Sequence, residues 1–184
     1  MKVLAISGSL RTESYNRKAL QVAKKIATDL DAEVRELDLR ELNLPLYDKD
    51  IQDRGMPEPV QILKKEIEAR DVLIIASPEY NYSVSGALKN MIDWASRGEK
   101  NSFNGKVAVI FGASTGGFGS LRGQTHLRQI LQALNVFILP QPQVFISRAE
   151  TAFNPYGSFA NPKNFESLKS LIEKSLAFAS KIKS

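Results

Sequence analysis

The stretch VLIIASPEYNYSVSGALKNMIDW, residues 72–94, begins with an unbroken apolar run, passes through a polar and aromatic turn, and ends in a helical pattern. A continuous apolar run of this length is typical of a central strand that is buried on both faces of a parallel sheet. Leu88, Met91, Ile92 and Ala95 then recur at helical spacing. A buried strand followed directly by a helix predicts an α/β fold with this strand near its centre.

The same alternation of short apolar runs and helical patterns extends over the rest of the chain. Further strands are predicted at residues 3–6, 33–39, 107–111 and 136–139. Helical faces are predicted at residues 19–30, 60–67, 127–134 and 165–179. Charged and apolar residues alternate in the second of these strands, as expected at the margin of a sheet. We therefore expect a five-stranded parallel sheet in the order 2-1-3-4-5, with helices on both faces.

Two segments depart from this alternation. Pro140 and Pro142 precede the apolar residues 144–146, which are expected as a short continuation of the last strand or as a separate extension. The segment 41–59 is predicted to be irregular because it is punctuated by Pro45, Gly55, Pro57 and Pro59. It is either a lid or a subunit contact.

Composition limits the possible functions. The chain has 184 residues, and we expect residues 1–184 to form a single domain. Because there is no cysteine, disulfides, thiolate metal sites and a cysteine nucleophile are excluded, and redox chemistry would need a cofactor. The net charge of +5 comes from basic residues that are mostly interleaved with acidic ones. This pattern argues against nucleic-acid binding and favours a weak attraction to small anions.

The hydropathy pattern indicates no membrane segment. The first apolar run has four residues before Ser7, which is too short for a secretion signal. No apolar run is long enough to span a bilayer as a helix. A cytoplasmic location without membrane insertion is therefore expected.

Three unusual loops follow strands that are neighbours in the expected sheet. Loop 1 covers residues 7–16, loop 2 residues 77–83, and loop 3 residues 112–119. Right-handed crossovers place all strand-to-helix loops at one edge of a parallel sheet, and ligands bind there, where the winding direction reverses. The three loops are therefore predicted to form one continuous site.

Loop 1 combines Gly8, several hydroxyl side chains, Arg11 and Asn16 just before a helix. This composition suits an anion, such as a phosphate, held by backbone N–H groups at a helix N-terminus. The loop is neither a Walker A sequence nor a G-x-G-x-x-G sequence. The alternative is that Ser14 merely caps the helix and Gly8 merely makes its turn, and both interpretations stay open.

Loops 2 and 3 are suited to a flat ligand. Pro78 ends the strand, and Glu79, Tyr80 and Asn81 offer planar faces and hydrogen-bonding edges. Loop 3 has glycines that permit close approach of the backbone, although glycine also serves simple turns. The composition of each loop alone is weak evidence for a ligand site. The expected meeting of the three loops at one edge of the sheet is stronger evidence.

The segments GSLRTESYN, PEYNYSVSGALKNMIDW and STGGFGSLRGQTHLR resemble the signature segments of the NADPH-dependent FMN reductase family. The resemblance extends from the first strand to about Phe153. It implies a flavodoxin-like three-layer sandwich, FMN as cofactor, NADPH or NADH as electron donor, and a homodimer or homotetramer. The acceptors implied are quinones or related small molecules, including free flavin, azo compounds and chromate.

The resemblance also implies residue roles. The FMN phosphate would be held by Ser9, Arg11, Ser14 and Asn16. The isoalloxazine ring would lie along Pro78, Glu79, Tyr80 and Asn81, with Ser114, Gly116 and Gly117 against its other side. Two residues depart from the family pattern: Ser120 stands where many relatives have glycine, and Asn154 where aspartate is common.

The expected function is an FMN-dependent oxidoreductase that accepts hydride from NAD(P)H and reduces the acceptor by a ping-pong mechanism. No catalytic acid, base or nucleophile is assigned, because the cofactor would carry the chemistry. The alternatives are a flavodoxin-like electron carrier and a flavin-binding redox sensor, neither turning over nicotinamide.

Other conspicuous residues have more ordinary interpretations. His126, the only histidine, is expected on a helix surface or in helix packing. Trp94 is expected in the core or at a subunit contact rather than stacked on the flavin. Arg122 and Arg128 either meet the cofactor or an NADPH phosphate, or lie on a solvated helix face or in an intersubunit ion pair.

Overall fold

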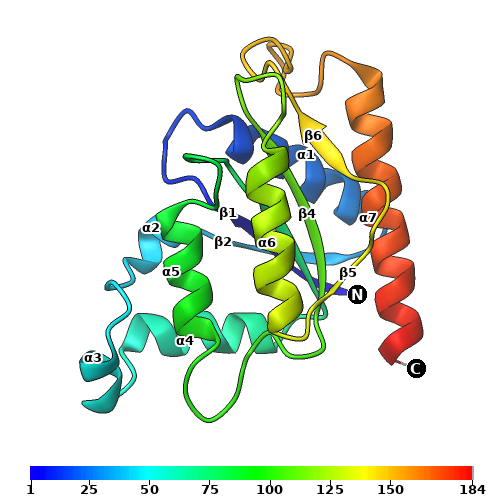
Figure 1. Ribbon diagram of the computed structural model, residues 1–184. Helices are drawn as coiled ribbons and strands as arrows, with labels where there is room; N and C mark the ends of the chain where they lie inside the picture. Colours follow the sequence, from blue (N-terminus) through cyan, green and yellow to red (C-terminus); the bar gives the residue numbers. More distant parts are fainter. Residues whose placement is uncertain (184) are drawn as a thin grey trace.

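A computed structural model describes residues 1–183 and contains a parallel sheet in the order β2-β1-β3-β4-β5 (Figure 1). The strands are β1 (Lys2–Ser7), β2 (Glu33–Leu37), β3 (Val72–Ala76), β4 (Val107–Ala113), β5 (Phe137–Ile138) and β6 (Val144–Ile146). All the strand pairings are parallel. The expected α/β class and strand order are therefore confirmed.

Helices cover both faces of this sheet. They are α1 (Tyr15–Asp29), α2 (Leu39–Leu42), α3 (Lys49–Asp53), α4 (Glu58–Glu68), α5 (Gly86–Ala95), α6 (Leu121–Ala133) and α7 (Pro162–Lys183). Helices α1 and α7 contribute to one hydrophobic cluster, and α4, α5 and α6 contribute to the other. Within residues 1–183, no helix combines the length and the apolar composition needed to cross a membrane.

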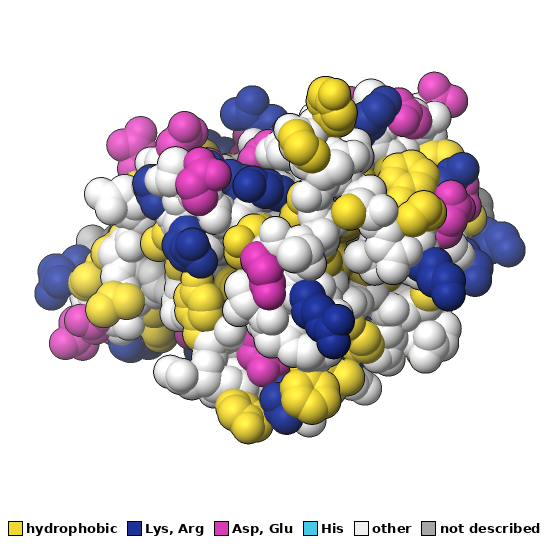
Figure 2. All heavy atoms as spheres, turned by 90° about the horizontal axis from the view of Figure 1, so that it is seen from above, with side chains coloured by type: hydrophobic (Ala, Val, Ile, Leu, Met, Phe, Trp, Pro, Cys, Tyr) yellow, Lys and Arg dark blue, Asp and Glu magenta, His cyan; other side chains and the backbone are white. Residues whose placement is uncertain are grey.

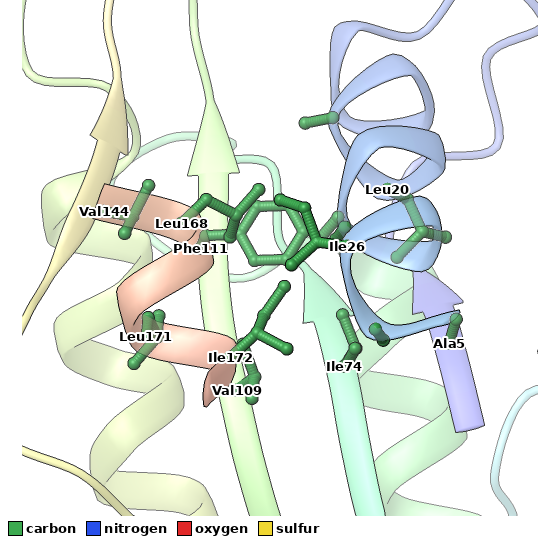
Figure 3. Close-up of a cluster of buried hydrophobic side chains, with 14 of the residues drawn as sticks. Ala5, Leu20, Ile26, Ile74, Val109, Phe111, Val144, Leu168, Leu171 and Ile172 are labelled. Carbon is green, nitrogen blue, oxygen red and sulfur yellow. The ribbon is translucent and has the colours of Figure 1, made fainter. Parts of the chain in front are cut away.

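The central strands are apolar without interruption because successive side chains enter opposite clusters. In β3, Ile74 joins the cluster beneath α1 and α7, whereas Leu73 and Ile75 join the cluster on the other face. Figure 3 shows Ile74 and Phe111 facing side chains of α1 and α7. Burial on both faces therefore accounts for the apolar run that opens the 72–94 stretch.

The edges of the sheet differ in detail from the prediction. The expected strand at 33–39 ends at Leu37, because the carboxylate of Asp38 accepts the N–H of Arg40 at 2.9 Å and starts α2. The expected strand at 136–139 is only Phe137–Ile138, since the chain leaves the sheet as it approaches Pro140. The chain then pairs again with the same edge of β4 through Val144–Ile146. Residues 144–146 therefore continue the line of the last strand and are not a separate extension.

The expectation that residues 41–59 lack regular structure is wrong in part. This segment includes the end of α2, the whole of α3 and the start of α4. The prolines and the glycine separate short helices instead of preventing them, and the carboxylate of Asp48 caps α3 by accepting the N–H of Asp50 at 2.8 Å. The segment contacts α5, because the Trp94 indole N–H donates to the carbonyl of Pro45 at 2.8 Å. Trp94 is fully buried and therefore belongs to the core.

Candidate functional site

The three unusual loops meet in one pocket at the carboxyl ends of β1, β3 and β4. Its volume is about 140 Å³. It is lined by Ser9, Arg11, Ser14, Tyr15, Asn16, Pro78, Glu79, Tyr80, Ala113, Ser114 and Thr115. Among the residues assigned by resemblance, Asn81, Gly116 and Gly117 are the ones outside this lining, and they lie on the adjoining exposed parts of loops 2 and 3.

Sequence reasoning missed Tyr15, Ala113 and Thr115. Tyr15 lies between two residues of the loop 1 motif, and its ring stacks on that of Phe153 with centroids 6.4 Å apart. Ala113 and Thr115 flank Ser114 at the end of β4. The sequence signal for these three residues is that each lies next to a residue of a recognised motif.

Loop 1 is organised by its own hydroxyl groups. Ser14 Oγ accepts the N–H of Arg17 at 3.3 Å and caps α1, which leaves open whether the same hydroxyl also contacts a ligand. Capping leaves the N–H groups of Glu13, Tyr15 and Asn16 without an acceptor in residues 1–183. These donors are therefore available to an anion at the helix N-terminus.

The guanidinium of Arg11 adds a positive charge to this end of the pocket. It is exposed and pairs with no carboxylate in the described chain, whereas the neighbouring Arg17 is paired with Asp38 at 3.0 Å. The helix N-terminus and Arg11 together favour a negatively charged group.

Asn16 has a different environment from the other loop 1 residues. It is buried, and its Nδ2 donates to the carbonyl of Ala113 at 2.9 Å. Its Oδ1 accepts the N–H of the same residue, also at 2.9 Å. The amide thus joins loop 1 to the end of β4, and its hydrogen bonds go to the protein backbone.

Loop 2 forms a tight turn at the rim of the pocket. Tyr80 and Ser83 exchange two backbone hydrogen bonds of 3.0 Å. The two residues between them, Asn81 and Tyr82, both have left-handed backbone conformations, with φ of 50° and 67°. Their N–H groups donate to no acceptor in residues 1–183 and are therefore available to a ligand.

The carboxylate of Glu79 is directed to the start of α6. Glu79 Oε2 accepts the N–H of Gly123 at 3.0 Å, and Oε1 lies 3.8 Å from Arg122 Nη1. The Arg122 guanidinium lies 4.2 Å from the ring centroid of Tyr82 and 4.4 Å from that of Phe118. Arg122 is therefore held between two exposed aromatic rings at the pocket rim.

The other two conspicuous residues of α6 lie outside the pocket. His126 is on the exposed surface, with Nδ1 3.1 Å from Ser83 Oγ, as expected for a helix-surface residue. Arg128 is half-buried and donates through Nη1 to the carbonyl of Leu139 at 3.0 Å. Burial lowers the pKa of the Arg128 guanidinium.

The glycines of loop 3 fall into two groups. A Cβ on Gly112 would lie 2.1 Å from the carbonyl oxygen of Ser77, and a Cβ on Gly119, which has φ of +54°, would lie 2.6 Å from the carbonyl carbon of Phe145. Both positions require glycine for folding. Gly116 and Gly117 have neither a left-handed φ nor a close neighbour, so the fold itself does not explain them.

The two departures from the family pattern are also explained. Ser120 has φ of 70°, a conformation that favours glycine, and its Oγ accepts a hydrogen bond from Gln124 Nε2 at 3.1 Å. Asn154 Oδ1 accepts the N–H groups of Tyr156 and Ser158 at 3.0 Å, in a loop outside the pocket.

A larger cavity of about 340 Å³ lies at the opposite edge of the sheet, where the charged residues have partners, although Arg70 Nε is left without an acceptor in residues 1–183. Lys106 Nζ donates to the carbonyls of Glu68 and Arg70. Burial raises the pKa of Asp71, but the hydrogen bonds from Lys183 and from the Lys2 N–H outweigh it and hold the pKa below its usual value. The loop pocket differs from this cavity in its position at the carboxyl ends of the strands and in its unpaired Arg11 guanidinium and helix N-terminal donors.

Comparison with known proteins identifies the family of the chain. Residues 1–151, which include all three loops, match the NADPH-dependent FMN reductase family. The chain belongs to the NADPH-dependent FMN reductase family. It is thus one of a family of oxidoreductases, as the signature segments predict.

Individual relatives support the family assignment. The chain is 44% identical over 174 residues to an NAD(P)H-dependent FMN reductase of Pseudomonas aeruginosa, covering 94% of this chain and 92% of the relative. It is 40% identical over 144 residues to a quinone reductase of Escherichia coli, covering 78% and 76%. The flavoenzyme NAD(P)H:(acceptor) oxidoreductase of Paracoccus denitrificans has the same fold, with a TM-score of 0.85, 32% identity, and coverage of 98% and 97%.

Substitution by alanine should change the free energy of unfolding by different amounts in the two groups of glycines. Gly119→Ala should lower the free energy of unfolding by roughly 2 kcal/mol or more, because it adds left-handed strain and a steric clash. Gly117→Ala should change it by less than about 0.5 kcal/mol, because a Cβ there meets nothing. Urea denaturation of the FMN-free proteins measures both. Equal losses in the two variants would contradict the distinction.

Proposed function

We propose that residues 1–184 form a single FMN-binding domain that takes hydride from NAD(P)H and reduces quinones or related small acceptors in the cytoplasm. The names of the relatives support this, since they include an NAD(P)H-dependent FMN reductase of Pseudomonas aeruginosa and a 2-hydroxy-1,4-benzoquinone reductase of a Burkholderia species. The observation that carries the proposal is the set of unpaired donors and unconstrained glycines around the loop pocket.

The pocket residues fit the two chemical parts of FMN. A phosphate dianion suits the free N–H groups at the start of α1, the Arg11 guanidinium, and the hydroxyls of Ser9 and Ser14. A flat ring suits Pro78 and Tyr80 on one side, and Ser114, Gly116 and Gly117 on the other, where no Cβ obstructs its approach.

The chain would supply binding and orientation. FMN, when bound, supplies the hydride and electron chemistry. The N–H groups of Asn81 and Tyr82 would donate to the polar edge of the ring and stabilise negative charge there. Asn16 would act less directly, since its amide fixes loop 1 to Ala113.

The charge on this face suits small ligands. Figure 2 shows it from above, with basic side chains scattered among acidic and hydrophobic ones. Such a surface favours compact anionic substrates over a long polyanion.

The reaction itself can be tested directly. NADPH or NADH should bleach the yellow colour of the flavin-loaded protein within seconds under anaerobic conditions, and steady-state turnover with a quinone should give parallel double-reciprocal plots. A panel of quinone, free flavin, azo dye, ferric and chromate acceptors identifies the preferred one. Bound flavin that neither nicotinamide bleaches would reject the enzyme and favour an electron carrier or a redox sensor.

The binding roles are tested by substitution. Arg11→Ala combined with Ser14→Ala should weaken FMN binding by about 100-fold, because the phosphate loses two charge-assisted contacts. Gly117→Ala, which leaves the fold intact, should weaken it by about 10-fold through contact with the ring. Quenching of flavin fluorescence measures both dissociation constants. Lys163→Ala, at an exposed position on α7, is the control.

We also propose that the chain forms a homodimer or homotetramer through the apolar surface beside the pocket. This surface comprises Leu10, Leu44 and Leu46 together with Leu39 and Ala87, around a cavity of about 330 Å³. Leu46 has an exposed fraction of 81%, and Leu10 of 40%. An apolar surface rimmed by polar residues is typical of a protein interface.

The substitution Leu46→Asp should convert the oligomer to a monomer at micromolar concentration, because it would bury an unpaired charge at the contact. Light scattering after gel filtration gives the mass of each species. The control is Ile182→Asp, which places the same charge at a leucine-sized position on α7 with an exposed fraction of 43%. A monomeric unaltered chain would disprove this assignment.

A further inference from the structure

Helix α6 lacks a cap from its own sequence. Ser120 occupies the N-cap position, but it is left-handed, and its side chain makes no capping hydrogen bond. Its hydroxyl instead accepts from Gln124 Nε2. The N–H of Gly123, in the first turn, is satisfied by the carboxylate of Glu79 from loop 2 at 3.0 Å. A carboxylate at a helix N-terminus is favoured by the helix dipole as well as by the hydrogen bond.

Loop 2 and α6 also approach each other very closely. A Cβ on Gly123 would lie 3.1 Å from the carbonyl oxygen of Ser83 and 3.2 Å from Glu79 Cβ. This contact accounts for glycine in the first turn of a helix, where it otherwise lowers stability. Arg122 and His126 add contacts to Tyr82 and to Ser83 Oγ. Loop 2 is thus attached to one face of α6.

The turn in loop 2 needs such support. Asn81 and Tyr82 are consecutive non-glycine residues with left-handed backbones. Each such residue costs about 1–2 kcal/mol, and tyrosine has no local hydrogen bond to offset it. Tyr82 is moreover 62% exposed, so burial of its ring does not stabilise the turn. The two backbone hydrogen bonds between Tyr80 and Ser83 close the turn, and the attachments to α6 add to them in opposing relaxation of this conformation.

We propose that Glu79 is a positioning residue for FMN: its carboxylate fastens the strained Asn81–Tyr82 turn to the N-terminus of α6. The side chain is only 14% exposed, and its two oxygens face Gly123 N–H and Arg122. Glu79 would therefore act through the backbone of the turn, whose Asn81 and Tyr82 N–H groups have no acceptor in residues 1–183, and not through contact of its charge with the ring. This role rests on the proposed function, because it presupposes that the pocket holds FMN.

Two substitutions of Glu79 distinguish its hydrogen bond to α6 from the negative charge of its side chain. Glu79→Gln keeps an oxygen that accepts the N–H of Gly123 and removes the charge, whereas Glu79→Ala removes both. Glu79→Ala should raise hydrogen exchange of the Ser83 and Gly123 amides by about 10-fold in the FMN-free protein and weaken FMN binding to a similar extent. Glu79→Gln should stay within about 2-fold of the unaltered protein in both measurements. Glu99→Ala, in an exposed loop far from the pocket, is the control.

A second variant changes the α6 side of the contact between loop 2 and α6. Gly123→Ala should raise exchange of the Ser83 amide with Glu79 intact, because its methyl group pushes loop 2 away from α6. Exchange that stays unchanged in both Glu79→Ala and Gly123→Ala would overturn the attachment. Equal loss of FMN affinity in Glu79→Gln and Glu79→Ala would overturn the positioning role and indicate a charge contact with the ring. Exchange is measured without FMN, so failure of the unaltered protein to bind FMN would count against the proposed function alone.

Discussion

The in-register pairing of β3 with both β1 and β4 is the constraint on which the rest of the structure depends. It places Ser7 beside Ala76, and Ala76 beside Phe111, so that β1 and β3 end at the same level and β4 ends two residues later, at Ala113. Each strand then enters its loop at the same edge. Had β3 been displaced by one residue, its side chains would have exchanged faces and the two hydrophobic clusters would be lost. The hydrophobic core therefore fixes where the loops begin.

Buried hydrogen bonds then hold the loops to one another. Asn16 connects loop 1 to Ala113, 97 residues away, and Ser85 Oγ donates to the carbonyl of Gly8 at 2.5 Å. The N–H of Ser77 donates to the carbonyl of Phe111 at 2.8 Å. Losing one partner of such a bond leaves a buried polar group unpaired, which costs about 1–3 kcal/mol. The pocket is consequently preorganised, and little reordering of its walls opposes ligand binding.

The fold and the location of the site could be predicted from the sequence, because both depend on local patterns. The apolar run at residues 72–76 indicated a central strand, and the polar stretches after three strands indicated the loops. The short helices α2 and α3 were missed because each depends on one aspartate cap rather than on periodicity. Strand β5 ends at Ile138, earlier than the apolar run predicts, because Pro140 follows it closely.

Side-chain roles in the site were harder to predict. Asn16 and Glu79 carry polar groups that the resemblance assigns to FMN, and both groups are bonded to backbone of a distant segment. Such partners are set by tertiary contacts, so neither spacing nor residue type reveals them. The left-handed Ser120 is a similar case, because its strain is visible only in the backbone angle.

The groups that the fold leaves unsatisfied give the clearest indication of the ligand. A hydroxyl, an amide or a glycine in a motif can serve the protein or a cofactor, and the sequence does not separate the two uses. In the structure, Ser14, Asn16, Gly112 and Gly119 have partners or steric reasons within the chain. The N–H groups at the start of α1 and in the loop 2 turn, the Arg11 guanidinium, and the open positions at Gly116 and Gly117 have none. Helix N-terminal N–H groups and an unpaired guanidinium suit an anion, and glycines without close neighbours admit a flat ring. Their concentration at one edge of the sheet is therefore best explained by a flat, negatively charged ligand, and the satisfied motif residues are what hold that edge in shape.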